Sequence, residues 1–146
     1  MSRNAESGFT LVELLVAMSI MALGLSVVAT TLMRRGSNFE ARKIAREIVT
    51  LARETRYRAN HEGRPGTLIF DSTERTLSNE AGRLLNLPEP FQVEMESAAS
   101  AGSGRIAFYP GGISSGGQVR LTSSQMEIVV KVDWLTSHID MVEVSP

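Results

Sequence analysis

The 146-residue sequence contains no cysteine and only two histidines. The absence of cysteine excludes disulfide bonds, thiolate zinc sites and a cysteine nucleophile. His61 and His138 have no neighbours at metal-ligand spacing and are interpreted as surface residues. The formal net charge of -1 produces no overall attraction to nucleic acid or to an anionic membrane surface.

Groups that could support catalysis are also scarce. A paired-carboxylate site could be imagined from Asp71, Glu74, Glu94 and Glu96. In a pattern of strands and turns, however, these acids are expected on the polar face. The glycine-rich stretch from Pro110 to Gly117 lacks the lysine and following helix of a phosphate-binding loop, and is interpreted as a flexible hairpin connection. We therefore expect no enzyme activity, no cofactor and no metal site.

A long apolar run stands out against this background. From Phe9 to Met33 every residue is hydrophobic or small except Glu13, and Arg34 and Arg35 end the run. As a helix rising about 1.5 Å per residue, the segment is long enough to cross a hydrocarbon layer of about 30 Å. A lone acid in such a segment typically costs about 2–4 kcal/mol, so Glu13 is a candidate functional residue.

Small residues recur on one face of this predicted helix. Ala22, Ser26 and Thr30 are spaced four residues apart. Such a stripe lets another helix approach closely in a membrane or a filament. Small residues are also common in membrane helices in general.

The rest of the chain predicts an amphipathic helix followed by strands. From Ser37 to about Asn60 the apolar residues keep helical spacing but occupy one face. This face comprises Ala41, Ile44, Ala45, Ile48, Leu51, Ala52 and Thr55. After Gly66 the period changes to two, which predicts a mainly antiparallel sheet. Met126 to Trp134 gives the longest alternation and predicts a central strand, and a change of phase at Met141-Val142 predicts a bulge.

Two parts of the sequence resemble a known family. Gly8-Phe9-Thr10-Leu11-Val12-Glu13 resembles the processing site of type IV pilins and of the pseudopilins of type II secretion. In those precursors a polar leader ends in glycine, phenylalanine follows, and glutamate is the fifth residue of the mature helix. The stretch from Arg105 to Leu121, with Phe108-x-Pro110-x-Gly112 and the pair Gly116-Gly117, resembles the GspH family of minor pseudopilins. That family often has a Thr-Gly turn before its last strand, where this chain has Thr136-Ser137.

The resemblance implies a fold and a domain organisation. The fold is α+β and pilin-like: a long N-terminal helix packed on a mainly antiparallel β-sheet or sandwich. Residues 1–8 would be a leader removed by prepilin peptidase, 9–33 a transmembrane and assembly helix, 34–62 its amphipathic continuation, and 67–146 a periplasmic β domain.

It also implies a function in assembly. The chain would be a structural subunit of the pseudopilus that drives export of folded proteins. Cleavage after Gly8 would expose Phe9 for N-methylation, and Glu13 would pair with the terminal amine of an adjacent subunit. The implied partners are other pseudopilins, prepilin peptidase, the bacterial inner membrane and secreted cargo.

Two other interpretations remain open. A minor pilin of a type IV pilus, acting in pilus assembly or DNA uptake, would share the same features. A soluble periplasmic binding domain with an ordinary signal peptide, cut near Val27-Val28-Ala29, is the second alternative. Charge does not settle the topology, because basic residues follow the apolar run, and the positive-inside rule would place that side in the cytoplasm.

Overall fold

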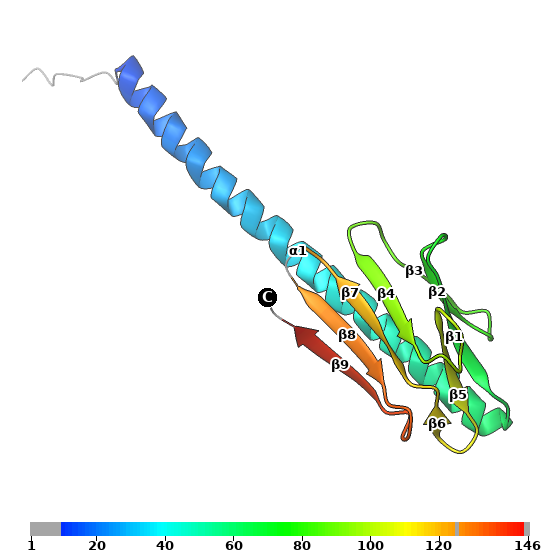
Figure 1. The fold of residues 1–146 in the computed structure, drawn as a ribbon. Helices are drawn as coiled ribbons and strands as arrows, with labels where there is room; N and C mark the ends of the chain where they lie inside the picture. The colour runs from blue at the N-terminus through cyan, green and yellow to red at the C-terminus, as the bar shows by residue number, and fades with distance from the viewer. Residues whose placement is uncertain (1–9, 125, 145–146) are drawn as a thin grey trace, which may run out of the picture. The chain divides into compact units, whose positions relative to one another are not determined.

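The computed structural model describes residues 10–124 and 126–144, apart from the side chains of residues 27–37. The chain forms two compact units, Met1–Gly36 and Ser37–Pro146. A single helix, α1 (Leu11–Glu62), begins in the first unit and ends in the second (Figure 1). Gly63 follows it with a φ of 65°. This left-handed conformation is the usual helix terminator, and it suits glycine, which has no Cβ to clash.

The second unit contains two antiparallel sheets beside the end of α1. The first has the strand order β3 (Leu84–Asn86), β2 (Thr76–Asn79), β1 (Gly66–Asp71), β5 (Arg105–Tyr109), β6 (Ile113–Ser114). The second has the order β4 (Gln92–Ser97), β7 (Gly117–Thr122), β8 (Glu127–Val132), β9 (Ile139–Val144). All pairings are antiparallel. The predicted α+β, pilin-like fold is confirmed.

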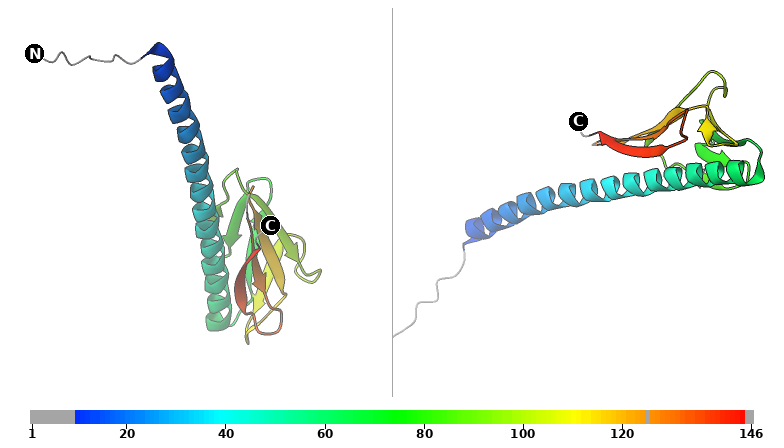
Figure 2. Two further views of the ribbon diagram at one scale, coloured as in Figure 1. Left: turned by 90° about the vertical axis from the view of Figure 1, so that its left-hand side faces the viewer. Right: turned by 90° about the horizontal axis from the view of Figure 1, so that it is seen from below.

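One face of α1 is buried against both sheets. Figure 2 shows the second part of the helix lying along one side of the strands. Ile44, Ile48, Leu51 and Thr55 are buried, as the helical spacing predicts. The sheets contribute fully buried side chains to the same core, among them Leu68, Leu77, Ile106, Phe108, Leu121 and Ile128, and Phe91 joins them from just before β4. Burying a side chain the size of Ile48 contributes about 1.5–3 kcal/mol, so this face is a main source of stability.

The glycine pair Gly116-Gly117 lies where the two sheets meet. A Cβ on Gly117 would lie 2.7 Å from the backbone oxygen of Glu96, which is closer than real contacts allow. A Cβ on Gly116 would lie 3.0 Å from the Cβ of Trp134. The glycines therefore let the chain pass from β6 to β7 in close contact with β4 and with the β8–β9 turn.

The structure corrects the predicted end of the central strand. β8 is a central strand, but it ends at Val132, and Trp134 lies beyond it with 64% of its surface exposed. Asp133 starts a turn in which its Oδ1 accepts hydrogen bonds from the amides of Leu135 and Thr136, at 3.0 and 2.8 Å. Hydrogen bonds from Thr136, first from its amide, lower the pKa of Asp133. The side-chain alternation continues by chance into a turn that this carboxylate organises.

Two further details differ from the prediction. β9 pairs with β8 in an unbroken register from Ile139 to Val144, so the predicted bulge at Met141-Val142 is wrong. The prediction of a flexible hairpin connection from Pro110 to Gly117 is wrong: β6, which was not predicted, lies within this stretch and pairs with β5, and the chain then passes to β7 in the other sheet. β3 was also missed, because three residues are too few to show a period.

Ser137 occupies the position where the family that the sequence resembles often has glycine. Its φ is 52°, in the left-handed region, and the residue is fully buried. Its carbonyl oxygen accepts a hydrogen bond of 2.9 Å from Arg56, whereas its buried hydroxyl has no partner among the described residues. The turn therefore keeps a conformation suited to glycine while carrying a serine.

We expect Ser137→Gly to stabilise the protein by about 1 kcal/mol. Glycine relieves a backbone strain of about 1–2 kcal/mol and removes the unpaired hydroxyl, while its greater freedom in the unfolded chain offsets part of the gain. The thermal unfolding midpoint of the full chain in detergent micelles measures the change.

Ser137→Ala is the matched control, since it removes the hydroxyl but keeps the Cβ. The control should gain less stability than Ser137→Gly. A lower midpoint for Ser137→Gly than for the wild type would contradict this account of the turn.

Candidate functional site

The first turn of α1 contains Glu13, the lone acid of the apolar run, together with the residue that caps the helix. Thr10 precedes the helix, and its Oγ1 accepts a hydrogen bond of 3.2 Å from the amide of Glu13. The carbonyl of Thr10 accepts the amide of Leu14, also at 3.2 Å. Thr10 is therefore the N-cap, and Glu13 is the third helical residue, where a negative charge is favoured by the helix dipole.

Thr10 is a functional candidate that the sequence analysis did not single out. The signal was present, because Thr-x-x-Glu before an apolar run is the pattern of a capping box. Gly8 and Phe9, the predicted processing residues, lie outside the described residues.

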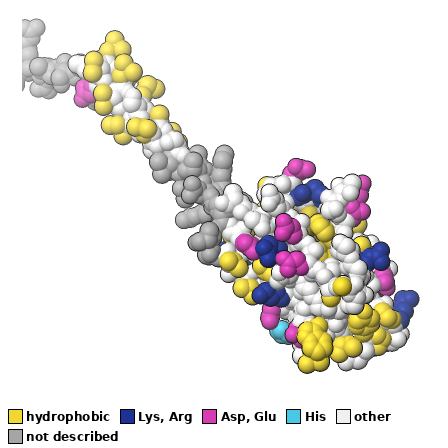
Figure 3. Space-filling view, viewed as in Figure 1, with side chains coloured by type: hydrophobic (Ala, Val, Ile, Leu, Met, Phe, Trp, Pro, Cys, Tyr) yellow, Lys and Arg dark blue, Asp and Glu magenta, His cyan; other side chains and the backbone are white. Residues whose placement is uncertain are grey.

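Apolar side chains cover the described part of α1 in the first unit on all sides. The large hydrophobic residues from Leu11 to Leu25 are between 53% and 79% exposed. Figure 3 shows hydrophobic side chains gathered along this part of the helix, whereas charges of both signs are interspersed over the second unit. A helix that is apolar all round is stable when lipid or other helices surround it.

The hydroxyl groups of this segment are satisfied within the helix. Ser19 donates to the carbonyl of Leu15 at 2.8 Å, and Ser26 donates to the carbonyl of Leu23 at 2.7 Å. These serines therefore bring no unmet hydrogen bond into an apolar environment. Ala22 and Ser26 of the predicted small-residue stripe are exposed, and the side chain of Thr30 lies outside the described residues.

The carboxylate of Glu13 differs from these hydroxyls. Between residues 11 and 26 it is the one charged side chain, it is exposed, and no cation lies within ion-pair distance among the described residues. In an apolar environment this charge would need a partner supplied from outside that helix. Among the described side chains of this segment, the Glu13 carboxylate is thus the one polar group that has no partner within its own helix.

No helix in the described part of the chain is both long and apolar enough to cross a membrane. The same residues contain no cluster of three histidine, cysteine, aspartate or glutamate side chains that could hold a metal ion.

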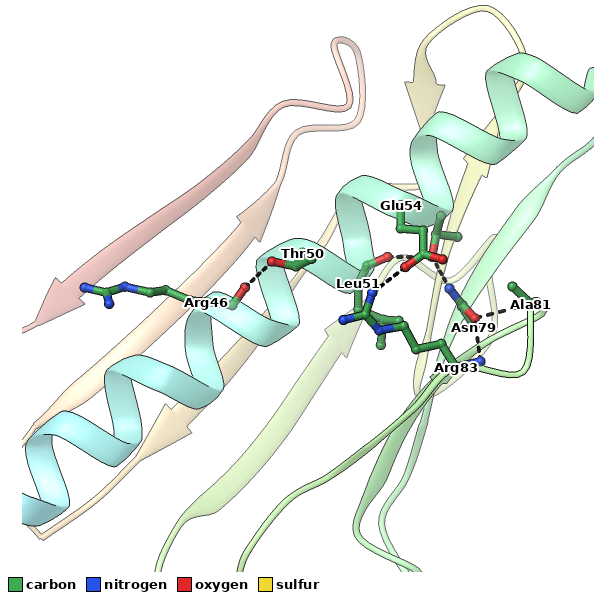
Figure 4. A network of polar contacts seen from close by, with 8 residues as sticks. Arg46, Thr50, Leu51, Glu54, Asn79, Ala81 and Arg83 are labelled. Carbon is green, nitrogen blue, oxygen red and sulfur yellow. Dashed lines mark hydrogen bonds and ion pairs between the residues drawn. The ribbon is translucent and has the colours of Figure 1, made fainter.

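Polar contacts in the second unit fasten the sheets to the helix. Arg83 forms an ion pair of 2.8 Å with Glu54, and the amide of Asn79 donates to the hydroxyl of Thr55 at 3.4 Å (Figure 4). Asn79 also accepts the amides of Ala81 and Arg83 through its side-chain oxygen. These groups fix the turn between β2 and β3, which is a structural role.

An ion pair joins α1 to the last strand. Arg42 donates to both carboxylate oxygens of Glu143, at 2.9 and 3.0 Å. The hydrogen bond from Arg42 lowers the pKa of Glu143 and the same contact raises the pKa of Arg42. Because both side chains are partly exposed, the pair orients β9 on the helix more than it adds to stability.

The four acids considered for catalysis lie in a turn and on a strand, where they have other contacts. Asp71 accepts the amides of Thr73 and Glu74 and so forms the predicted turn. Glu96 binds Arg120 at 3.3 Å on the neighbouring strand. Glu94 faces Arg120 in the register of β4 and β7, away from the turn that holds Asp71 and Glu74. The structure thus does not bring these four acids together as one site.

Both histidines are exposed, as predicted. His61 stacks on Tyr57 with ring centroids 5.6 Å apart, and His138 contacts Asp140 at 3.0 Å. These contacts lie on the surface of α1 and at the start of β9.

Comparisons with known proteins gave two matches, one to the N-terminal segment and one over most of the chain. Residues 3–29 match the prokaryotic N-terminal methylation motif. The chain is also similar to a protein of Xanthomonas campestris pv. campestris named type II secretion system protein H. The two are 27% identical over 141 residues, which cover 94% of this chain and 83% of the relative. No solved structure matches the chain significantly.

We expect Thr10→Val to loosen the first turn of α1. Valine has nearly the shape of threonine but lacks the oxygen that accepts the Glu13 amide, and loss of such a cap costs about 1 kcal/mol. The exchange of the Glu13 amide with solvent, measured by NMR on the full chain in micelles, should become about fivefold faster.

Thr10→Ser keeps the acceptor oxygen and is the control, with exchange close to that of the wild type. Equal exchange rates in the valine and serine variants would show that Thr10 does not act as the cap.

Proposed function

Because this chain is a GspH-like pseudopilin, we propose that it is a structural subunit of the pseudopilus, the periplasmic filament of type II secretion. The observation that carries the proposal is the apolar helix from Leu11 to Ser26, exposed on all sides and charged only at Glu13. Such a surface requires neighbours. The name of the Xanthomonas relative favours type II secretion over a type IV pilus.

The first step is processing of the precursor. Prepilin peptidase cuts after Gly8, and the new amine of Phe9 is methylated. Before the cut, the nitrogen of Phe9 is part of a peptide bond and carries no charge. Cleavage thus creates a cation four residues before Glu13.

The second step is assembly. The subunit is anchored in the inner membrane by residues 9–33, with its second unit in the periplasm. As the helix leaves the bilayer, it packs among the helices of its neighbours, with the stripe Ala22, Ser26 and Thr30 available for close contact. The carboxylate of Glu13 pairs with the terminal amine of the adjacent subunit.

This pairing sets the axial position of one helix against the next. In a low-dielectric environment an ion pair is much stronger than at a surface, and an unpaired charge is costly. Since Ser19 and Ser26 are satisfied within their own helix, the other described side chains of the segment impose little axial preference. Glu13 therefore penalises wrong registers.

Gly8→Val should leave the precursor uncut, since a branched side chain replaces the glycine at the cleavage position. Mass spectrometry of the chain purified from membranes should then find residues 1–8 still attached. Gly24→Ala is the control, because a Cβ there meets open space, and it should be processed normally. A Gly8→Val protein that starts at Phe9 would disprove this cleavage site.

Glu13→Leu should still insert into the membrane but should not enter filaments. Removing one partner of a buried pair costs about 3–5 kcal/mol, which corresponds to a loss of more than 100-fold in incorporation. The amount of the chain in sheared pseudopili, relative to the membrane fraction, measures the effect.

Ser26→Ala is the matched control and should assemble normally, because the hydroxyl it removes bonds only to its own helix. Normal incorporation of Glu13→Leu would remove the pairing from the mechanism.

A further inference from the structure

β9 is an edge strand with one side unpaired. It lies at the end of the second sheet and pairs with β8 alone. The amide of Asp133 donates to the carbonyl of His138 at 2.9 Å, so the backbone groups of His138 face β8. In an antiparallel pair, successive residues turn their backbone groups alternately toward the partner strand and away from it. By that alternation the backbone groups of Asp140, Val142 and Val144 face β8, and those of Ile139, Met141 and Glu143 face away from the sheet.

A groove runs beside this free edge. It has a volume of about 380 Å³ and lies between β9 and α1, with Ile139 and Met141 on the strand side. The helix side comprises Arg46, Val49, Thr50 and Arg53. The outward-facing backbone of β9 thus borders a cavity that an extended chain could enter.

Two arginines on the helix side lack acceptors. Arg46 and Arg53 are exposed, and neither guanidinium contacts a hydrogen-bond acceptor or a carboxylate in the described part of the chain. Arg46 lies near Glu143, but Arg42 already occupies both oxygens of that carboxylate. Figure 4 shows the Arg46 side chain extending from α1 with no contact drawn at its guanidinium.

The two faces of β9 differ in chemistry. On the face toward α1, a strand added to the edge would place alternate side chains near Arg46 and Arg53. On the opposite face, its other side chains would lie beside Val142 and Val144, each 44% exposed. Seven residues of helix separate the arginines by about 10 Å. Carboxylates on every second residue of a strand, about 6.7 Å apart, can reach both.

We propose that the groove between α1 and β9 binds an extended protein segment that alternates acidic and apolar residues and adds as a strand to β9. The backbone of the segment pairs with Ile139, Met141 and Glu143, its carboxylates bind Arg46 and Arg53, and its apolar side chains cover Val142 and Val144. Strand addition of this kind obtains affinity from backbone hydrogen bonds and specificity from alternate side chains. The inference concerns the second unit alone and does not depend on cleavage at Gly8 or on pairing at Glu13.

The test uses the full chain in detergent micelles and a labelled eight-residue peptide in which glutamate alternates with valine. Binding is followed by fluorescence anisotropy at low salt. The Glu-Val peptide should bind, whereas a peptide with lysine in place of glutamate, and one with alternate backbone amides methylated, should not. Failure of the Glu-Val peptide to bind, or equal binding of the methylated peptide, would overturn the proposal.

A double variant tests the helix side of the groove. Arg46→Gln with Arg53→Gln should weaken peptide binding by about fivefold to tenfold, as expected for two partly exposed ion pairs. Arg64→Gln with Arg105→Gln removes the same charge from exposed positions outside the groove and off β8 and β9, and should have no such effect. Equal weakening of peptide binding by the two double variants would indicate non-specific electrostatic attraction and would overturn the proposal.

Met141→Pro removes an outward amide while leaving the bonds to β8 in place, since proline is tolerated on the free side of an edge strand. It should abolish peptide binding. Hydrogen exchange of the wild type gives the same information without a substitution: the peptide should slow exchange at Ile139, Met141 and Glu143 but not at Val142. Protection of none of the three outward amides would overturn the proposal.

Discussion

The burial of one face of α1 under two sheets holds the second unit together. Neither sheet has another helix to cover it in the described residues, so Ile44, Ile48 and Leu51 complete the core for both. The glycine pair before β7 lets the sheets converge over this face. The same helix carries a second apolar surface, from Leu11 to Leu25, which its own chain does not cover. One helix thus carries a covered and an uncovered apolar surface, and the uncovered one is the basis of the proposed assembly.

Much of this fold could be predicted from the sequence, because burial in the second unit follows periodicity closely. The face of α1 is the clearest example: all the residues expected from helical spacing are buried. The buried side chains of the strands also follow the predicted alternation. They include Ile106 and Phe108 on β5 and Val119 and Leu121 on β7. These assignments succeed because each element has one face on the core and one in water.

The errors arose where the alternation of apolar and polar side chains does not follow the backbone. Trp134 fits the alternation of β8, but the carboxylate of Asp133 organises a turn that ends the strand. The apparent change of phase in β9 comes from Val142, an apolar residue on the exposed face of an edge strand, and not from an extra residue in the ladder. At the candidate site, Glu13 was found as a lone acid, whereas the cap formed by Thr10 was missed although Thr-x-x-Glu before the apolar run signals it. The cleavage site and the boundaries of the leader and membrane segment stay predictions.

The turn after β8 has a practical consequence. Trp134 is the single tryptophan of the chain, it is mostly exposed, and its carbonyl is held by the amide of Ser114 at 2.9 Å. Its indole is therefore a natural optical reporter at a fixed place on the surface. Emission from an indole in water lies at long wavelength and moves to shorter wavelength when a contact excludes solvent. The intrinsic fluorescence of the unmodified protein thus reports directly whether this end of the second unit is covered in an assembly.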